Sequence, residues 1–413
     1  MTTRLASLGK SLPTLSPSLL FPTSMTLKPS QIRDILNAKR EEFNAFNREA
    51  LQVLERYRQA LKHVSEMSDS DLEEKLLKCD KPAGAKPLEP LSKGSNAVIA
   101  ANLVWQNREQ SLTWVRDRLT GITTFAVDGS QIYPSKDLSI PIALVQIGWF
   151  ENLHLPTGDY EKDVAVDIMT PQDLRVGDNG EMADRRVSMR RFQMETQRLV
   201  EYMKACSQPE SCLVFLDGSL VATFADVFDA ETKSFYVDCL LELLRTSESC
   251  RVPLVAYIDT TSAKDLTGML QALFDLPEPR SIHDAQLLSR LMEWGDRTPL
   301  FLCERSGILD YYEEQRRTIT FTYLKTNRDN PPARLEMPLW MYEAGLTEKV
   351  VNWVRGEVIV GSGYPYVIET ADQTAVLQTE DRQAFYKILQ DWAETQALDL
   401  RFSRKMVSKV RRR

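Results

Sequence analysis

Two short motifs, each an apolar run that leads into Asp-Gly-Ser, constrain the fold of this chain more than any other feature. The first is FAVDGSQIYP at residues 125–134, and the second is LVFLDGSLVA at residues 213–222. Each apolar run predicts a buried strand, which ends at Asp128 in the first motif and at Asp217 in the second. A carboxylate at the end of a core strand is costly unless a positive group lies beside it. That group could be a peptide amide, a lysine or a metal ion.

The composition excludes several classes of protein. The chain has 413 residues, 43% of them hydrophobic, which is enough for two or three domains and at least one large core. No apolar run approaches the ~18 residues of a membrane span, so we expect no contact with a membrane. The six cysteines form no CxxC pair, which predicts reduced thiols and a cytoplasmic protein. A net charge of −7 argues against a protein coated in nucleic acid, although it allows a local basic groove.

The two ends of the chain differ from the rest in charge. Residues 1–33 contain no acidic residue, and we interpret residues 1–28 as a disordered extension, with a transit peptide as the alternative. Residues 397–413 form a predicted basic tail, because seven basic residues and no acidic residue occur in the last thirteen positions. The tail is either solvated or a contact for phosphates or an acidic partner.

Between these ends the pattern predicts a helical arm over residues 29–119 and an α/β domain over residues 120–396. In the arm, apolar periodicity predicts helices at 29–66, 69–78 and 96–118, with a proline-rich linker at 79–94. The first elements of the domain are predicted as strands at 122–127, 138–150 and 161–169, a helix at 181–205, a strand at 212–216, a helix at 230–246 and a strand at 253–259. This order predicts a ribonuclease H-like mixed sheet flanked by helices, in which the first and fourth strands are neighbours. Further on, we expect helices at 262–274, 283–294 and 381–396 and strands at 299–304, 317–325, 333–337 and 364–369.

Three carboxylates are the candidate site. Asp128 and Asp217 close the neighbouring strands, and Glu195 lies at the edge of the apolar stripe of the helix between them. Like charges at this spacing would repel unless a divalent cation neutralised them, and hard oxygen ligands suit Mn²⁺ or Mg²⁺. The Gly-Ser after each aspartate is expected to form a tight turn. The alternatives are an ordinary Asx turn at each motif and a salt bridge from Glu195 to Arg191 or Arg198.

Four further polar residues belong to the hypothesis. Asp259 also ends a predicted strand, where it is either a fourth ligand or, as we favour, the N-cap of the next helix. Asp284 is expected to be a helix cap. Lys264 and Lys325 are possible contacts for a DNA backbone.

Rival chemistries fail at essential residues. A haloacid dehalogenase-type phosphatase needs Asp-x-Asp-Gly-Thr, and the nucleophile positions here are Ala126 and Phe215. The strand after Asp128 lacks the glycine hairpin of actin-like ATPases, and the chain has no P-loop, no GxGxxG and no GxSxG.

The motifs, in order, resemble those of the NurA nucleases. They are FAVDGSQIYP, RRFQMETQ, LVFLDGSLV, SIHDAQLLSRLMEWGDRTPLF, FTYLKT with ARLEMP, and GYPYVIETAD, and they span residues 120–395. The resemblance implies a ribonuclease H-like, Mn²⁺-dependent DNA nuclease that forms dimers and resects DNA ends with HerA, a hexameric ATPase. It also implies metal binding by Asp128, Glu195 and Asp217 and a functional role for Tyr364. Asp372 stands where the family often has a histidine.

From these observations we predict metal-assisted phosphodiester hydrolysis in DNA, as an exonuclease or single-strand endonuclease in double-strand break repair. Asp128, Glu195 and Asp217 would hold one or two ions, so that no side chain need act as the base. The departure at Asp372 keeps open a catalytically weak DNA-binding adaptor of a translocase ATPase. A nuclease of the same fold that acts on RNA is a further alternative.

Overall fold

The computed structural model describes residues 27–79, 84–91, 96–174, 181–401 and 403, and divides the chain into one unit of residues 1–52 and another of residues 53–413. Nearly all of the predicted extension, and the basic tail beyond residue 403, lie outside the described residues. The first unit contains α1 (Pro29–Ala38) and the start of α2 (Arg40–Glu66). The helix predicted at 29–66 is therefore present, with a break at Lys39.

The second unit begins within α2, whose Tyr57, Leu61 and Val64 are buried in its core. After α3 (Asp69–Leu77), the predicted linker contains a strand, β1 (Gly84–Pro87). The helix predicted at 96–118 begins only at Arg108, because Asn107 caps it by accepting a hydrogen bond from the Gln110 N–H. These two predictions are corrected: part of the presumed linker belongs to the sheet, and α4 is Arg108–Leu119.

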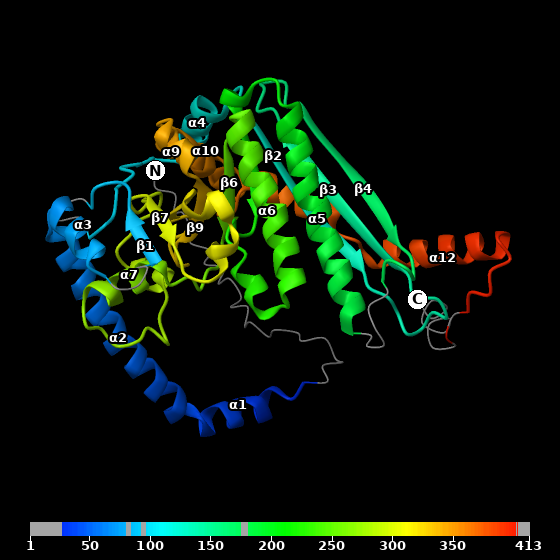
Figure 1. The fold of residues 1–413 in the computed structure, drawn as a ribbon, viewed down its shortest axis with the longest axis horizontal. Helices are drawn as coiled ribbons and strands as arrows, with labels where there is room; N and C mark the ends of the chain where they lie inside the picture. Colours follow the sequence, from blue (N-terminus) through cyan, green and yellow to red (C-terminus); the bar gives the residue numbers. More distant parts are fainter. Residues whose placement is uncertain (1–26, 80–83, 92–95, 175–180, 402, 404–413) are drawn as a thin grey trace, which may run out of the picture. The chain divides into compact units, whose positions relative to one another are not determined.

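A nine-stranded sheet organises the second unit (Figure 1), in the order β1-β7-β8-β9-β6-β5-β2-β3-β4. The other strands are β2 (Thr123–Ile132), β3 (Ala143–Asn152), β4 (Tyr160–Met169), β5 (Cys212–Asp217), β6 (Leu254–Ile258), β7 (Phe301–Glu304), β8 (Ile319–Leu324) and β9 (Ala333–Pro338). β2 pairs antiparallel with β3 and parallel with β5, β3 pairs antiparallel with β4, and β5 pairs parallel with β6. These five strands have the predicted ribonuclease H-like arrangement, and four antiparallel or edge strands extend it beyond β6.

Helices cover both faces of this sheet. α5 (Glu181–Ala205) and α6 (Ala230–Cys250) lie side by side and pack with Phe125, Val127 and Val214. On the opposite face, α10 (Thr347–Val360) and α11 (Tyr366–Ala375) pack with Ala126 and Phe215. Successive strand residues point to opposite faces, so β2 and β5 contribute alternate side chains to two separate cores.

The C-terminal third contains the largest difference from expectation. The strand predicted at 364–369 is wrong, because Tyr364 and Pro365 lead into helix α11 and the Pro365 carbonyl accepts from the N–H groups of Ile368 and Glu369. No element was predicted at 339–360, where the structure has α9 (Leu339–Glu343) and α10. The remaining elements are α7 (Asp265–Leu273), α8 (Asp284–Leu288), α12 (Thr379–Thr395) and 3₁₀ turns at Pro209–Ser211, Thr223–Val227, Ile308–Tyr311 and Glu313–Arg317.

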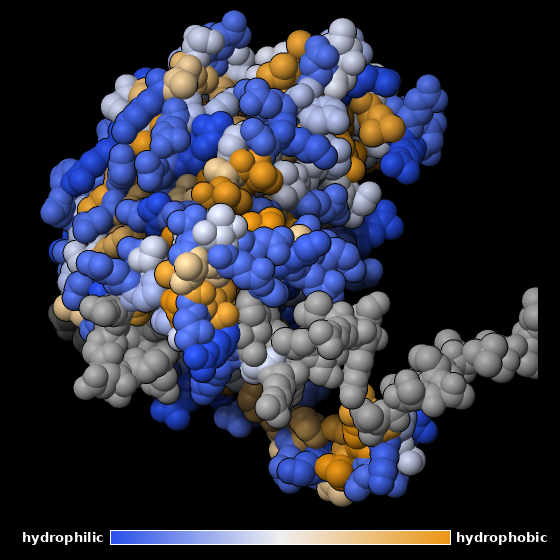
Figure 2. Space-filling model, turned by 90° about the vertical axis from the view of Figure 1, so that its right-hand side faces the viewer, coloured by the Kyte–Doolittle hydropathy of each residue, from blue (hydrophilic) through white to orange (hydrophobic). Residues whose placement is uncertain are grey.

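Within the described ranges, no helix is long and apolar enough to cross a bilayer. On the face shown in Figure 2, apolar side chains lie in small groups between polar ones.

Candidate metal centre

The two aspartates of the repeated motif lie on neighbouring parallel strands. The last residue pair between β2 and β5 is Val127 with Leu216, so Asp128 and Asp217 occupy the next position on each strand. Both follow the alternation of Ala126 and Phe215, and their side chains therefore belong to the face that α10 and α11 cover. The sequence predicts this juxtaposition, and the strand register produces it.

The first motif does not end its strand, in contrast to our expectation of a tight turn. β2 continues to Ile132, and Asp128 pairs with Gly148 of β3. Gly129 is required for space instead: a Cβ there would lie 2.3 Å from Oε1 of Glu195 and 2.7 Å from Cγ of Arg191. In the second motif, Gly218 does leave the strand, with a φ of +141° that favours glycine.

Glu195 approaches from α5, on the face opposite to the aspartate side chains, and reaches the site across Gly129. Nη1 of Arg191 donates to Glu195 Oε1 at 3.0 Å and to the Gly129 carbonyl at 3.2 Å, so the salt bridge considered as an alternative is present. Burial raises the pKa of Glu195 to about 8, Arg191 opposes that rise, and the charges of Asp128 and Asp217 add to it. Glu195 is thus held by Arg191, and its carboxylate is close enough to Asp128 and Asp217 to be repelled by their charges.

Asp372, in the second half of α11, and Tyr364, two residues before that helix, complete the group. Burial, a hydrogen bond with Asp372 and the charges of Asp217 and Asp372 raise the pKa of Asp128 to about 6, against a backbone hydrogen bond that lowers it. The Tyr364 hydroxyl donates to Asp217 Oδ1 at 3.0 Å. The pKa of Asp217 is raised, first by burial and then by Asp372 and Asp259, although the Tyr364 hydrogen bond lowers it.

The two predicted caps have other positions. Asp259 follows β6, whereas the N-cap of α7 is Lys264, so Asp259 does not cap that helix and its charge acts on Asp217. Asp284 is the first residue of α8 and is buried. Its carboxylate accepts from the N–H groups of Leu266 and Thr267, which caps α7 from a distance.

The donor set fits a hard divalent cation in its chemistry. The residues that would hold the ion are Asp128, Glu195 and Asp217, whose mutual repulsion an ion would relieve. Over the described part of the chain, no three His, Cys, Asp or Glu side chains are grouped closely enough to enclose one ion. The side chains therefore offer the right oxygen ligands without forming a closed ligand set, because Arg191 holds Glu195 and Asp372 holds Asp128.

The two lysines considered as DNA contacts differ in accessibility. Lys325 is only 3% exposed, and its ammonium donates to the carbonyls of Ser289 and Asn330, which leaves it unsuited to a DNA contact and corrects that expectation. Lys264 is exposed and donates to the carbonyls of Pro279 and Arg280. Its contact with DNA stays a prediction.

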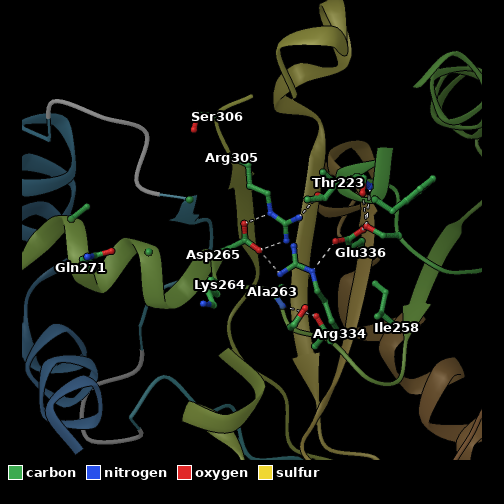
Figure 3. Close-up of a pocket in the computed structure, with 18 of the residues that line it drawn as sticks. Thr223, Ile258, Ala263, Lys264, Asp265, Gln271, Arg305, Ser306, Arg334 and Glu336 are labelled. Atoms are coloured by element: carbon green, nitrogen blue, oxygen red, sulfur yellow. Dashed lines mark hydrogen bonds and ion pairs between the residues drawn. The ribbon is translucent and has the colours of Figure 1, made fainter. Parts of the chain in front are cut away.

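A buried ion network next to this site has no counterpart in the sequence analysis (Figure 3). Asp265 of α7 is paired with Arg305, after β7, and with Arg334 of β9, which also pairs with Glu336. Burial alone would raise the pKa of Asp265, yet Arg334 and Arg305 bring it below its usual value. Four residues from three distant segments form the network, so no local spacing in the sequence could indicate it.

Comparison with known proteins agrees with the motifs. A profile of the NurA domain matches residues 122–377, which is more than half of the chain. A crystal structure of NurA is similar over 70% of this chain and 98% of its own, with 12% identity and a TM-score of 0.38. A NurA bound to dAMP and manganese (64% and 86% covered, 11% identity, TM-score 0.34) and the catalytic domain of human Endonuclease V (71% and 92%, 14%, 0.31) are also similar.

No curated protein sequence matches significantly. The assignment therefore rests on the profile match, which spans both Asp-Gly-Ser motifs, the helix that carries Glu195 and the segment with Tyr364 and Asp372. This chain belongs to the NurA domain family, a family of nucleases.

Proposed function

We propose that this protein is a divalent-metal-dependent deoxyribonuclease that hydrolyses phosphodiester bonds. The observation that carries the proposal is the convergence of Asp128 and Asp217 from neighbouring parallel strands, with the pKa of each raised first by burial and then by the charges of neighbouring aspartates. Carboxylates in this state favour a cation, because its charge offsets their repulsion. Clusters of perturbed carboxylates are typical of functional sites.

Each residue of the site has a separate task in this proposal. Asp128, Asp217 and Glu195 would hold Mn²⁺ or Mg²⁺, which when bound supplies a hydroxide near neutral pH and stabilises the leaving oxygen. Tyr364 fixes the orientation of Asp217 through its hydroxyl. Arg191 positions Glu195 and tethers it to the backbone of Gly129.

The test is cleavage of end-labelled linear DNA, single- and double-stranded, with Mn²⁺, Mg²⁺ or Ca²⁺. Wild-type protein should cleave with Mn²⁺ or Mg²⁺, and Asp128→Asn should not. Asp391→Asn, on the outer surface of α12, is the matched control and should cleave like wild type. Normal cleavage by Asp128→Asn at saturating Mn²⁺ would refute the metal-site assignment, and an RNA of the same sequence tests the choice of nucleic acid.

One observation favours a second candidate, a catalytically weak adaptor that binds DNA for a translocase ATPase. Asp372 shares a hydrogen bond with Asp128, and it places a carboxyl group where the family often has a histidine. If wild type binds DNA but cleaves it no faster than Asp128→Asn with any metal, the adaptor is favoured. If Asp372→His then cleaves, the departure at residue 372 is the cause.

We also propose a homodimer that works with a HerA-type hexameric ATPase in DNA end resection. A net charge of −7 gives the protein little general attraction for DNA at physiological salt, so a translocating ring that delivers substrate would compensate. Light scattering tests the dimer, and a pull-down with the HerA-type ATPase of the same genome tests the partner. Deletion of residues 401–413 should weaken DNA or ring binding and leave Mn²⁺ affinity unchanged. A monomer that is fully processive alone would overturn this assembly.

A further inference from the structure

A pocket with a volume of about 960 Å³ lies against the ends of β5 and β6. Among the residues that line it are Ser219, Phe224, Thr260, Lys264, Arg305 and Ser306. Ser219 is two residues after Asp217, and Thr260 directly follows Asp259. The pocket therefore lies against the residues that follow Asp217 and Asp259, and none of Asp128, Glu195 and Asp217 lines it.

The wall of the pocket contains Arg305, whose side chain is held by hydrogen bonds that occupy only some of its N–H groups (Figure 3). Nε and Nη2 of Arg305 donate to the two oxygens of Asp265 at 2.5 and 2.6 Å, and Nη1 donates to Thr223 Oγ1 at 2.7 Å. A guanidinium has five N–H groups, and these bonds use three of them. In the part of the chain that is described, nothing accepts from the other two, and the side chain is 20% exposed. Because Asp265 already orients it, an anion could bind without ordering the side chain.

The charged side chains around Arg305 are compatible with binding of an anion. Arg305, Arg334 and Lys264 line the pocket together with two acids, Asp265 and Glu336. Both acids are buried and already paired with arginines, whereas Lys264 is exposed. Arg334 is 1% exposed, and within the described residues its Nη2 has no hydrogen-bond partner. A further acid, Asp284, lies behind this wall and accepts from the Tyr323 hydroxyl.

The same pocket has an aromatic surface at its edge. Phe224 is 45% exposed, and its ring is held edge-on by Phe192 and Tyr236, at centroid distances of 5.9 and 5.0 Å. It directly follows Thr223, the residue that accepts from Arg305. Exposed aromatic rings beside cationic groups are how proteins bind single strands, since bases stack on the ring and phosphates meet the charge.

We infer that this pocket binds one nucleotide of the single-stranded substrate next to the bond that is cut, with its phosphate against Arg305 and Ser306 and its base against Phe224. The inference rests on the proposed nuclease function and adds a substrate subsite to it. Glu336 links the subsite to the cleavage site, because its Oε2 accepts from Ser219 Oγ and from the Leu220 N–H, both at 2.8 Å. The turn that carries Asp217 and the wall that carries Arg305 are thus parts of one hydrogen-bonded network.

The experiment measures binding of a fluorescein-labelled oligothymidylate in EDTA by anisotropy, over a series of salt concentrations. Ser306→Asp places a carboxylate beside Arg305 at an exposed position, so it should raise Kd at least tenfold and reduce the salt slope by about 0.7. Phe224→Ala should raise Kd by a similar factor and leave the salt slope unchanged. Ser70→Asp on α3 and Val227→Ala, which is 83% exposed on the same short helix as Phe224, are matched controls and should bind like wild type.

Competition separates a nucleotide from a bare phosphate. Thymidine monophosphate should displace the labelled strand better than thymidine or inorganic phosphate. Equal competition by phosphate would overturn the base contact, and unchanged Kd values for both pocket variants, folded as judged by their melting temperatures, would overturn the subsite. These outcomes are independent of the cleavage assay on Asp128→Asn: if that variant loses cleavage while the pocket variants bind normally, the nuclease stands and the subsite falls.

Discussion

The Asp-Gly-Ser tripeptide has the same sequence in both motifs and a different structure in each. Residues 128–130 remain in β2 and pair with β3, whereas residues 217–219 leave β5 at Gly218. The first glycine makes space for Glu195, and the second adopts a backbone conformation that favours glycine. One tripeptide therefore serves two physical requirements, and both place an aspartate at the same edge of the sheet. Substitutions at the three matched positions can test how far the two motifs are equivalent.

The largest effects are expected at the aspartates. Asp128→Asn and Asp217→Asn should each lower cleavage on the order of a thousandfold, since each removes a metal ligand worth several kcal/mol of transition-state stabilisation. Their stabilities should differ in metal-free protein at pH 8. Asp128→Asn removes repulsion from Asp372 and should gain roughly 1–3 kcal/mol, whereas Asp217→Asn should gain less, because Tyr364 already compensates its charge. Urea unfolding measures this, and destabilisation by Asp128→Asn would contradict the repulsion.

The next largest difference is expected between the glycine variants, in their free energies of unfolding. Gly129→Ala places a methyl group against Cγ of Arg191 and the Glu195 carboxylate, so we expect a loss of roughly 1–3 kcal/mol and reduced cleavage. Gly218→Ala meets no atom within 4 Å and costs only its backbone strain, on the order of 1–2 kcal/mol. Gly129→Ala combined with Glu195→Ala should recover part of the stability lost at Gly129. An equal cost for both single variants, without such recovery, would show that the packing explanation is wrong.

The prediction of the fold succeeded for elements that bury one face, because burial of one face produces a regular apolar period in the sequence. The β2–β3–β4 order, α5 and the pairing of β2 with β5 follow from alternating or helical apolar periods and from strand order. It failed at α11, where the aromatic and β-branched run YPYVI is typical of a strand. There, packing of Val367, Ile368 and Ala371 on the sheet favours a helix over local propensity. The prediction also missed α10. Apolar residues occur on several sides of this helix, so the sequence shows no alternation of an apolar and a polar face with a helical period.

The sequence predicted that the two strand residues of the candidate site, Asp128 and Asp217, would lie close together. It did not predict which other side chains they contact. Asp128 and Asp217 meet because of register, which strand order already implies. The route of Glu195 across Gly129, the hydrogen bond of Asp372 with Asp128 and the network around Arg305 depend on how distant segments pack. Spacing along the chain carries no information about such contacts.

Stability should depend on pH through the first motif. The pKa of Asp128 is raised to about 6 and that of Glu195 to about 8, so the folded protein binds protons that the unfolded chain has released. The stability that these two carboxyl groups contribute is therefore complete below about pH 4 and should fall by a few kcal/mol as pH rises toward 9. Asp284, whose pKa is also about 6, contributes to the same slope, but Mn²⁺ should flatten only the part due to the carboxylate cluster. Melting curves at pH 5, 7 and 9 test this, and a slope that Mn²⁺ leaves unchanged would assign it to Asp284.

The smallest difference in stability is expected between the serine variants. It depends on the hydrogen-bond partner of the serine in each motif. Ser219 Oγ donates to Glu336 Oε2 at 2.8 Å, a charge-assisted bond, so Ser219→Ala should cost about 1–2 kcal/mol. Ser130 Oγ only accepts from the Leu377 N–H at 3.3 Å, so Ser130→Ala should cost about 0.5 kcal/mol. Because Glu336 joins the second motif to Arg334 and Asp265, Ser219→Ala should also weaken oligothymidylate binding, and Ser130→Ala should not. Equal effects of the two variants on binding would mean that the Asp217 turn and the Arg305 pocket are not coupled.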